Sequence, residues 1–504
     1  MPTTGTSTGF PLRLARPDTF SRVREFFCRA EFSDATLCRA LGMGDMSELG
    51  RVRWDAIPLD SLSEPLRWCI RVFVRGLSAA EPESRVVCGE ETFAALLALG
   101  LLLPAKKEPG AVVCPVWLYP ADGFVVVSDR TSDPDGDPYT PPEDVVFPAI
   151  YTGTLRFLRL LPEAGGGEAL DLCGGSGIGA LHFSRTARAA ATADLTERSA
   201  FFAEFNASLN GASVSSLCGD LYAPVLGRQF DVISVHPPFV PATGSNMVYR
   251  DGGDTGEEVT RRTVEGLPTY LRPGGTCVIL CVARDTEAQT FEQRAHEWLG
   301  AAGGEFDVLF GLEKILSVEE VVESMRKRGQ QISEETCQQL YVRLRSLGTR
   351  QFVYGALFIR RYEAPVAQPP FRIGLTTKGR AADFERLFAW RRHCRKPGLS
   401  EWLKQSRPRF APRLQLTARH VVQDGELVPV EFVFSIADGL EAALRPDVWI
   451  VPLLARLNGT RSVQEVFAAA HAADELPPGF KLDDFAELVR RMIERGFLQV
   501  EFPR

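Results

Sequence analysis

The sequence lacks any run of about 18 uninterrupted apolar residues, so a membrane-spanning helix is not expected. Its first ten residues are rich in Thr and Gly and have neither the basic start nor the apolar centre of a signal peptide. The eleven cysteines form no C-x-x-C pair and no zinc-finger spacing with the six histidines. These absences predict a cytoplasmic protein with reduced thiols, no membrane contact and no metal site.

Length and charge limit the number of domains and the kinds of partner that are expected. The 504 residues suggest about three domains, because a domain has roughly 150 residues. The net charge of −7 and the pI near 5.6 argue against bulk nucleic-acid binding but leave room for a local basic surface. Proline-rich and glycine-rich stretches divide the chain. We expect an N-terminal domain over 1–130, a central domain over 144–362 and a C-terminal domain over 371–504.

The N-terminal domain is expected to be mainly helical. Helical periodicity occurs at 17–42, 64–78 and 90–102, and strand-like runs follow at 111–119 and 123–128. Short helices followed by a β-hairpin favour a winged-helix-like unit. A packing or lid domain and a substrate-recognition domain are equal alternatives for its role.

The central domain alternates between strands and helices, which predicts a mostly parallel sheet with helices on both faces. The expected strands are 169–172, 189–193, 214–218, 230–235, 276–282, 306–310 and 352–360. The fold class is therefore α/β, a Rossmann-like seven-stranded sheet flanked by N- and C-terminal winged-helix-like α+β domains. The charged helical insertion 317–347 is expected to be a solvated face or a lid.

A glycine-rich turn follows the first expected strand, in the run ALDLCGGSGIGAL from Ala169 to Leu181. Glycines let the backbone approach a ligand closely and leave the N-terminus of the next helix open. The run also fits the dinucleotide pattern G-x-G-x-x-A, with Asp194 about 20 residues further on as the ribose acid. It therefore predicts a nucleotide-type cofactor without choosing between nicotinamide and other cofactors.

The loop His236-Pro237-Pro238-Phe239 follows the fourth expected strand. Two prolines make a stiff loop at the carboxyl end of the sheet, and the aromatic ring after them can stack on a planar group. A dehydrogenase has no systematic need for such a loop. A methyltransferase does, because the acceptor must be held in line with a sulfonium methyl group.

These motifs make the region 144–362 similar to class I S-adenosylmethionine-dependent methyltransferases. The similarity includes CGDLYAP at 218–224, YRDGGDTG at 249–256 and LRPGG at 271–275. Within this class the region resembles the small-domain N-methyltransferase branch, which carries Asn-Pro-Pro-(Phe/Tyr) and methylates glutamine amides, adenine N6 or guanine N2. The resemblance implies S-adenosylmethionine as the cofactor.

The resemblance also implies roles for individual residues. The implied cofactor-binding residues are Asp171, Cys173, Gly174, Gly175, Gly177, Asp194, Leu195, Asp220, Leu221, His236 and Thr154. The implied catalytic residues are His236, Pro237, Pro238 and Phe239, and the implied substrate contacts are Phe239, Tyr249, Arg250, Asp251, Glu257 and Tyr151. Asp194 would bind the ribose hydroxyls and Asp220 the adenine edge. For Arg250, Asp251 and Glu257, an equal alternative is that they are ordinary charged residues of a surface loop.

Two residues depart from the family pattern: Cys173 replaces a glycine, and His236 replaces the asparagine. A neutral histidine offers one donor and one acceptor in a different geometry from asparagine, and it can also take a proton. We therefore expect N-methylation of a small molecule or peptide of specialised metabolism, with protein glutamine or an RNA base as alternatives. A NAD(P)-dependent oxidoreductase and a non-catalytic regulatory protein remain alternatives of other classes.

The C-terminal region opens with a basic stretch. Residues 371–414 include twelve basic and three acidic residues, with Trp390, Trp402 and Phe410 interleaved. Such a stretch could bind nucleic acid by stacking, but an amphipathic helix pair with a solvated basic face is favoured. The following stretch 457–498 resembles the small winged-helix modules of the PqqD-like type, which handle peptides or regulate an enzyme.

Overall fold

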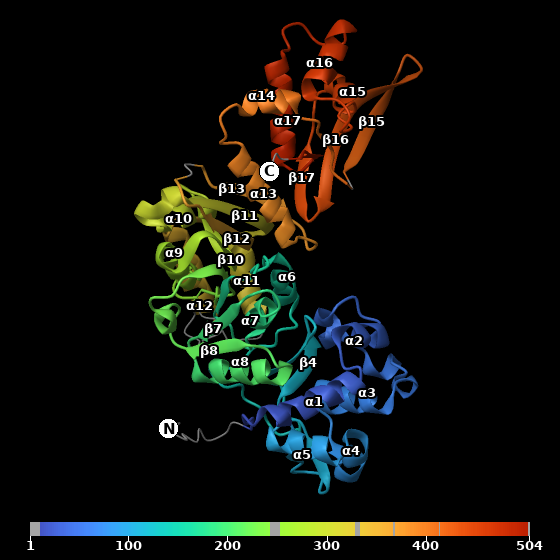
Figure 1. Ribbon diagram of the computed structural model, residues 1–504, viewed down its shortest axis with the longest axis vertical. Helices are drawn as coiled ribbons and strands as arrows, with labels where there is room; N and C mark the ends of the chain where they lie inside the picture. Colours follow the sequence, from blue (N-terminus) through green and yellow to red (C-terminus); the bar gives the residue numbers. More distant parts are fainter. Residues whose placement is uncertain (1–10, 242–251, 328–332, 366–367, 413, 502–504) are drawn as a thin grey trace.

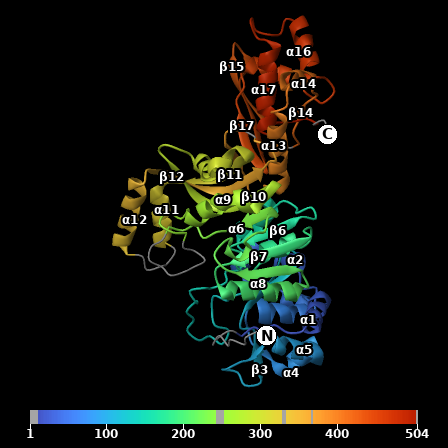
Figure 2. The same cartoon turned by 60° about the vertical axis from the view of Figure 1, so that its left-hand side comes forward.

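The computed structural model describes residues 11–241, 252–327, 333–365, 368–412 and 414–501. Three parts follow one another along its longest axis (Figure 1). The N-terminal helices lie at one end, a large sheet with its helices lies in the middle, and the last helices and strands lie at the other end. Two helices, α11 (Val318–Lys327) and α12 (Glu334–Ser346), project sideways from the middle part (Figure 2).

The N-terminal part is mainly helical, as expected. Its elements are α1 (Pro17–Arg29), α2 (Asp34–Leu41), α3 (Glu64–Cys69) with the π-helical turn η4 (Ile70–Val74), β1 (Ala79–Ala80), α4 (Glu81–Cys88), α5 (Glu90–Ala98), β2 (Leu103–Pro104), β3 (Ala111–Val113), β4 (Trp117–Ala121) and β5 (Phe124–Ser128). The strands form an antiparallel β1-β3-β2 sheet and a separate β4–β5 hairpin. Buried aromatic rings hold the helices together, since Trp68 contacts both Phe26 and Phe73 edge to face.

The β4–β5 hairpin is joined to helix α8 (Glu197–Asn210) by side-chain amides. Asn206 accepts a hydrogen bond from the Val127 N–H at 2.8 Å and donates one to the Val127 carbonyl at 3.0 Å. Asn210 makes the same pair of bonds with Val125, at 2.9 and 2.7 Å. The two amides take the place of a neighbouring strand along β5. The N-terminal and middle parts are therefore joined by directional bonds.

The middle part contains the seven strands that the sequence predicts. Its elements are α6 (Thr152–Leu160), β6 (Glu168–Leu172), α7 (Ile178–Phe183), β7 (Ala189–Asp194), α8, β8 (Val214–Cys218), β9 (Phe230–Val235), α9 (Glu258–Tyr270), β10 (Leu271–Thr286), α10 (Phe291–Trp298), β11 (Phe306–Leu316), α11, α12 and β12 (Thr349–Arg361). The strand order is β8-β7-β6-β9-β10-β12-β11, with the first five parallel and β12 antiparallel to both neighbours. The order reverses between β6 and β9, so a crevice is expected at their carboxyl ends.

The sheet continues beyond β11. Strand β13 (Phe371–Leu375) pairs in parallel with β11, and β17 (Leu440–Leu444), β16 (Glu426–Asp438) and β15 (Gln415–Gln423) follow in antiparallel pairing. The seven-strand order is therefore confirmed, but four of the C-terminal strands extend that sheet to eleven strands.

The remaining C-terminal elements pack at the end of this sheet. They are α13 (Ala381–His393), α14 (Leu399–Gln405), β14 (Arg409–Phe410), α15 (Val451–Leu454), α16 (Val463–Ala472), α17 (Leu482–Glu494) and β18 (Leu498–Gln499). Helix α13 is anchored by stacking of Phe384 on Phe358, with ring centres 3.5 Å apart. It is also anchored by Arg391, whose Nε donates to the buried Asp307 carboxylate at 3.0 Å.

Two features are absent from the described residues. None of their helices is long and apolar enough to cross a membrane. Within the same residues, no group of three or more His, Cys, Asp or Glu side chains is placed to hold a metal ion.

Candidate active site

The glycine-rich turn lies between β6 and α7, at the point where the strand order reverses. At two of its glycines the backbone is packed so closely that a side chain would not fit. A Cβ atom on Gly174 would lie 1.9 Å from Thr192 Oγ1, and one on Gly177 would lie 2.7 Å from the Ala203 Cβ. Gly177 also has φ +78°, which favours glycine. The turn therefore forms a bare backbone cradle, which fits a nucleotide-type cofactor.

Asp171, at the end of β6, is turned into the protein. Only 4% of the residue is exposed, and its Oδ1 accepts a hydrogen bond from Ser234 Oγ at 2.6 Å. It also accepts a bond from the backbone of Ala180, and burial raises the pKa of its carboxyl to about 7. A Cβ on Gly179 would lie 2.5 Å from this carboxyl group. Asp171 therefore contacts protein groups around the glycine-rich turn.

Asp194, at the end of β7, supports the same turn from the neighbouring strand. Its Oδ2 accepts a hydrogen bond from the Gly175 N–H at 2.9 Å, and its Oδ1 accepts one from the Thr196 N–H at 3.3 Å. Burial raises the pKa of this carboxyl above its usual value, against the opposing effect of these bonds. A carboxylate in this position has acceptor capacity left for the two hydroxyls of a ribose. Leu195, the next residue, is exposed.

Cys173 adopts φ +55°, a backbone conformation that residues other than glycine rarely adopt. This explains why a glycine is usual at this position. Burial raises the pKa of its thiol well above the normal value, with a smaller contribution from Asp194. The thiol is therefore protonated near neutral pH and is a poor nucleophile.

Asp220 and Leu221 follow β8 on the same edge of the sheet. The Asp220 carboxylate is exposed and pairs with Arg262 of α9 at 2.7 Å. Leu221 is buried and has φ +48°. The backbone N–H of Gly219 bonds to the Asp194 carbonyl at 2.8 Å, which holds this turn beside the end of β7. A ligand that contacts the Asp220 carboxylate would have to share it with Arg262.

The loop His236-Pro237-Pro238-Phe239 follows β9 directly. The His236 ring is partly buried and lies 5.7 Å from the Phe157 ring of α6 and 6.2 Å from the Phe239 ring, measured between ring centres. The His236 and Phe239 rings are nearly parallel, with an angle of 16° between them. Burial lowers the pKa of His236 to about 4, so the imidazole is neutral near pH 7.

A second loop packs against the backbone of this motif. A Cβ on Gly252 would lie 2.8 Å from the Pro238 carbonyl oxygen, and one on Gly256 would lie 2.5 Å from that of Phe239. Glycines at these positions let the two loops touch. Asp254, between them, pairs with Arg343 of α12 at 3.2 Å, so the projecting helices reach this loop. Tyr249, Arg250 and Asp251, expected as substrate contacts, lie outside the described residues.

Glu257, expected as a substrate contact, is buried inside the protein. Only 3% of it is exposed, and its carboxylate accepts bonds from Arg284 Nε at 2.9 Å and Arg294 Nη2 at 2.6 Å. The Arg284 backbone N–H donates to the same carboxylate at 2.7 Å. These bonds join the start of α9 to β10 and α10. We therefore do not carry Glu257 into the proposed site as a substrate contact.

Replacing Glu257 should affect stability far more than substrate binding. We expect Glu257→Ala to lower the free energy of unfolding by about 3–5 kcal/mol, because it leaves two buried arginines without their partner. Urea unfolding measures this change. The matched control is Glu265→Ala on the same helix, where the exposed pair with Arg261 contributes little. Unchanged stability together with a raised KM for the acceptor would instead assign Glu257 to substrate binding.

Helix α6 supplies the remaining expected residues. Thr154 is half-buried in its first turn, and Tyr151, which precedes the helix, is 46% exposed and stacks on Phe147 with ring centres 4.3 Å apart. The same helix carries Phe157, which sequence reasoning missed. Its only signal was its place on the apolar face of a helix before the first strand. Ser234 was also missed, although a hydroxyl inside an otherwise apolar strand could have indicated it.

Known proteins are similar to the part of the chain that holds this candidate site. Residues 148–295 match the family model described as the methyltransferase small domain. The chain is 27% identical over 158 residues to a Methanocaldococcus jannaschii protein named as an N5-glutamine methyltransferase, covering 29% of this chain and 80% of that protein. It is 34% identical over 157 residues to a release factor glutamine methyltransferase of Xylella fastidiosa, covering 27% of this chain and 54% of that protein. It therefore spans about half the length of the second relative.

One solved structure is also similar. It is the 16S rRNA N2 G1207 methyltransferase of T. thermophilus in complex with AdoMet and guanosine, with 17% identity and a TM-score of 0.25, covering 44% of this chain and 58% of that chain.

Residues 148–295 match the methyltransferase small domain, and they lie in a sheet whose strand order is β8-β7-β6-β9-β10-β12-β11. This match indicates an S-adenosylmethionine-dependent methyltransferase, so the cofactor is S-adenosylmethionine and not a nicotinamide.

Proposed function

We propose that the protein transfers a methyl group from S-adenosylmethionine to a planar nitrogen of a peptide or protein, with the side-chain amide of glutamine as the leading acceptor. The first relatives are named for glutamine methylation, which supports this choice. A nitrogen of a small molecule of specialised metabolism is the second candidate. It is favoured by the histidine at position 236, where this branch usually has asparagine.

The observation that carries the proposal is the position of His236 at the carboxyl end of β9, where its ring lies nearly parallel to that of Phe239. Burial lowers the pKa of this histidine to about 4, so near pH 7 one ring nitrogen donates and the other accepts. An amide group offers an N–H donor and a carbonyl acceptor. A neutral imidazole therefore keeps the pair of hydrogen bonds that an asparagine would give, although the spacing of the two groups differs.

The proposed roles of the residues follow from their positions. The bound cofactor supplies a methyl group on a sulfonium. The backbone of the glycine-rich turn and the Asp194 carboxylate hold the cofactor, while Asp171 holds the turn. His236 orients the acceptor nitrogen, and Phe239 stacks on its planar group. A group with a pKa near 4 is a weak base near pH 7, so His236 acts by orientation. As the N–CH3 bond forms and the S–CH3 bond breaks, the nitrogen gives up one proton to water and S-adenosylhomocysteine is released.

The experiment uses pairs of short peptides that differ at a single position, with glutamine in one and glutamate in the other. The protein is incubated with each peptide and S-adenosylmethionine, and mass spectrometry locates any added methyl group. We expect methylation of the glutamine peptide on the amide nitrogen and none of its glutamate partner, which lacks that nitrogen. Equal methylation of both peptides, or a methyl group on oxygen or carbon, would overturn the nitrogen assignment.

The pH dependence of kcat tests the state of His236. With saturating cofactor and acceptor, we expect kcat to show no inflection from His236 between pH 6 and 8, because the imidazole becomes protonated only as the pH approaches about 4. The variant His236→Asn, which cannot be protonated, should have the same profile over this range. An inflection near pH 6.5 in the wild type that disappears in the variant would contradict this prediction.

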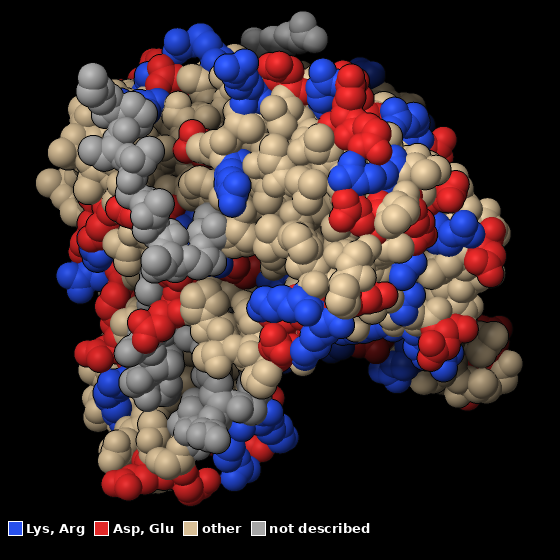
Figure 3. Space-filling model, turned by 90° about the horizontal axis from the view of Figure 1, so that it is seen from below, with Lys and Arg blue, Asp and Glu red and all other residues tan. Residues whose placement is uncertain are grey.

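The flanking parts are proposed to serve the same reaction. Between Glu64 and Val113 the order is helix, strand, helix, helix and hairpin, which supports a winged-helix-like unit. On the face seen from the N-terminal end, basic and acidic side chains are interspersed (Figure 3). This mixed charge favours a peptide or protein acceptor over an RNA base.

A further inference from the structure

The residues of the basic stretch 371–414 fall into two sets, one that forms structural contacts and one that lines a cavity. Some of its arginines form structural ion pairs. Arg372 pairs with Asp285 at 2.7 Å, and Arg391 pairs with the buried Asp307 at 2.9 Å. Phe410, one of the three interleaved aromatics, packs on Phe434 with ring centres 5.6 Å apart. These groups belong to the core and are not a binding surface.

A second set of residues from the same stretch lines a cavity of about 700 Å³ in the C-terminal part. It lies between α13, α14, β14 and β18, away from the glycine-rich turn (Figure 1). Its basic residues are Arg386, Arg407 and Arg409, and its aromatic residues are Trp390 and Trp402. The size is within the roughly 300–1,000 Å³ of small-molecule sites.

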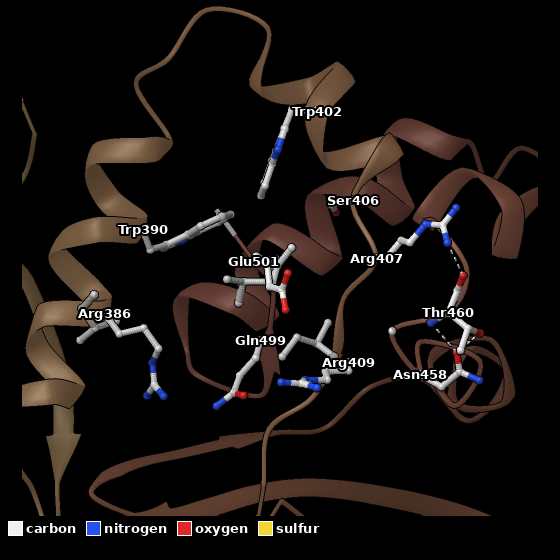
Figure 4. Close-up of a pocket in the computed structure, with 15 residues that line it drawn as sticks. Arg386, Trp390, Trp402, Ser406, Arg407, Arg409, Asn458, Thr460, Gln499 and Glu501 are labelled. Atoms are coloured by element: carbon white, nitrogen blue, oxygen red, sulfur yellow. Dashed lines mark hydrogen bonds between the residues drawn. The ribbon is translucent and has the colours of Figure 1, made fainter. Parts of the chain in front are cut away.

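The lining separates into an aromatic side and a polar side. The rings of Trp390 and Trp402 lie on one side, with centres 6.4 Å apart, and the polar ends of Arg386, Gln499 and Arg409 lie on the other (Figure 4). Because Trp390 is only 1% exposed, a ligand in this cavity would meet the partly exposed Trp402 ring at one end and guanidinium groups at the other.

The arginines of the cavity are poorly neutralised. Among the described residues, no carboxylate lies within 4.0 Å of the guanidinium groups of Arg407 or Arg409, and Arg386 approaches Asp383 only at 3.6 Å. Arg407 Nη1 donates to the Thr460 carbonyl at 2.9 Å, which fixes the side chain without neutralising it. Glu501 is the acidic residue of the lining. Counting only the groups that line the cavity, three arginines and one glutamate leave an excess of about two positive charges, which Asp383 partly offsets through Arg386. A concave site with excess positive charge favours an anion.

We propose that this cavity binds a ligand that carries both a phosphate monoester and a planar ring, such as a nucleoside monophosphate, with the phosphate on Arg386 and Arg409 and the ring against Trp402. Arginine forms paired hydrogen bonds with phosphate, and tryptophan stacks on planar rings. The dianionic charge of a phosphate monoester matches the excess charge better than a single carboxylate does. This site is separate from the methyl-transfer site, and its test does not depend on the acceptor.

The experiment is isothermal titration of the full chain with uridine 5′-monophosphate, uridine and inorganic phosphate, with S-adenosylhomocysteine present at saturation to fill the cofactor site. We expect saturable binding of the nucleotide, at least tenfold tighter than binding of either fragment. Removing one charge-assisted contact by Arg409→Gln should weaken nucleotide binding roughly tenfold. Glu501→Gln should strengthen it severalfold, because it removes the negative charge of the lining.

The matched control is Arg445→Gln, which makes the same change at an exposed arginine in the same part of the chain but outside the cavity. It should leave binding unchanged. Equal affinity of the wild type and Arg409→Gln, or no saturable binding of the nucleotide at millimolar concentration, would overturn the proposal. A uridine oligonucleotide that binds far more tightly than the mononucleotide would overturn it in favour of a nucleic-acid strand.

Discussion

His236→Ala is expected to lower kcat roughly 100-fold to 1000-fold while changing the Kd for S-adenosylhomocysteine by less than about twofold. The imidazole lies beside Phe239, beyond the end of β9, and among the described residues it makes no hydrogen bond to the glycine-rich turn or to Asp194. Its loss therefore removes a contact to the acceptor nitrogen but leaves the cofactor contacts in place. Steady-state kinetics with a peptide that the protein methylates measure kcat, and titration with S-adenosylhomocysteine measures the Kd.

Two further variants control this experiment. His236→Asn keeps one donor and one acceptor, and it should recover kcat to within about tenfold of the wild type. His471→Ala removes an exposed histidine of α16 and should change neither quantity. If His236→Ala instead weakens cofactor binding as much as it lowers kcat, His236 only shapes the loop, and its role in orienting the acceptor is wrong.

The sequence carried enough local information to predict the sheet. Each parallel strand is a short apolar run, and β6 and β7 each end in an aspartate at a turn. Because the carboxyl ends of parallel strands share one edge of a sheet, Asp171 and Asp194 could be placed together without knowing any contact. The structure then separates their roles, since Asp171 is turned inward while Asp194 accepts from the Gly175 N–H.

Long-range contacts were beyond such reasoning. Glu257 looks like a loop charge in the sequence, and its two arginine partners come from β10 and α10, 27 and 37 residues further along the chain. The pairing of β13 with β17 joins segments that are separated in the chain by two helices and three strands. A local pattern of polar and apolar residues does not specify which distant segment covers a side chain or extends a sheet edge.

The structure also connects the N-terminal part to the cofactor turn, which no motif indicated. Asn206 bonds to Val127 of the hairpin and, through the same Nδ2, to the Ser176 carbonyl at 2.9 Å. Its side chain is fully buried. One amide therefore holds both the docked hairpin and the glycine-rich turn. Movement of the N-terminal part relative to α8 would disturb the turn through this residue.

Asp194→Ala is expected to raise the Kd for S-adenosylhomocysteine about 100-fold and to lower kcat at saturating cofactor by less than about tenfold. The carboxylate is proposed to accept bonds from two ribose hydroxyls, and hydrogen bonds to charged groups contribute about 1.5–3 kcal/mol each. The substitution also frees the Gly175 N–H, which the carboxylate binds at 2.9 Å. Isothermal titration gives the Kd, and kinetics at high cofactor concentration give kcat.

Asp194→Asn separates the two contributions of this carboxylate. It keeps an acceptor for the Gly175 N–H but loses the charge and one acceptor position, so its Kd should lie between those of the wild type and the alanine variant. Asp60→Ala, at a fully exposed aspartate of the N-terminal part, should leave the Kd unchanged. If Asp194→Ala lowers kcat sharply but keeps the Kd, the carboxylate acts on the acceptor, and the assignment of the ribose to the end of β7 is wrong. If both aspartate variants bind as the wild type does, the cofactor is held by the glycine-rich backbone alone.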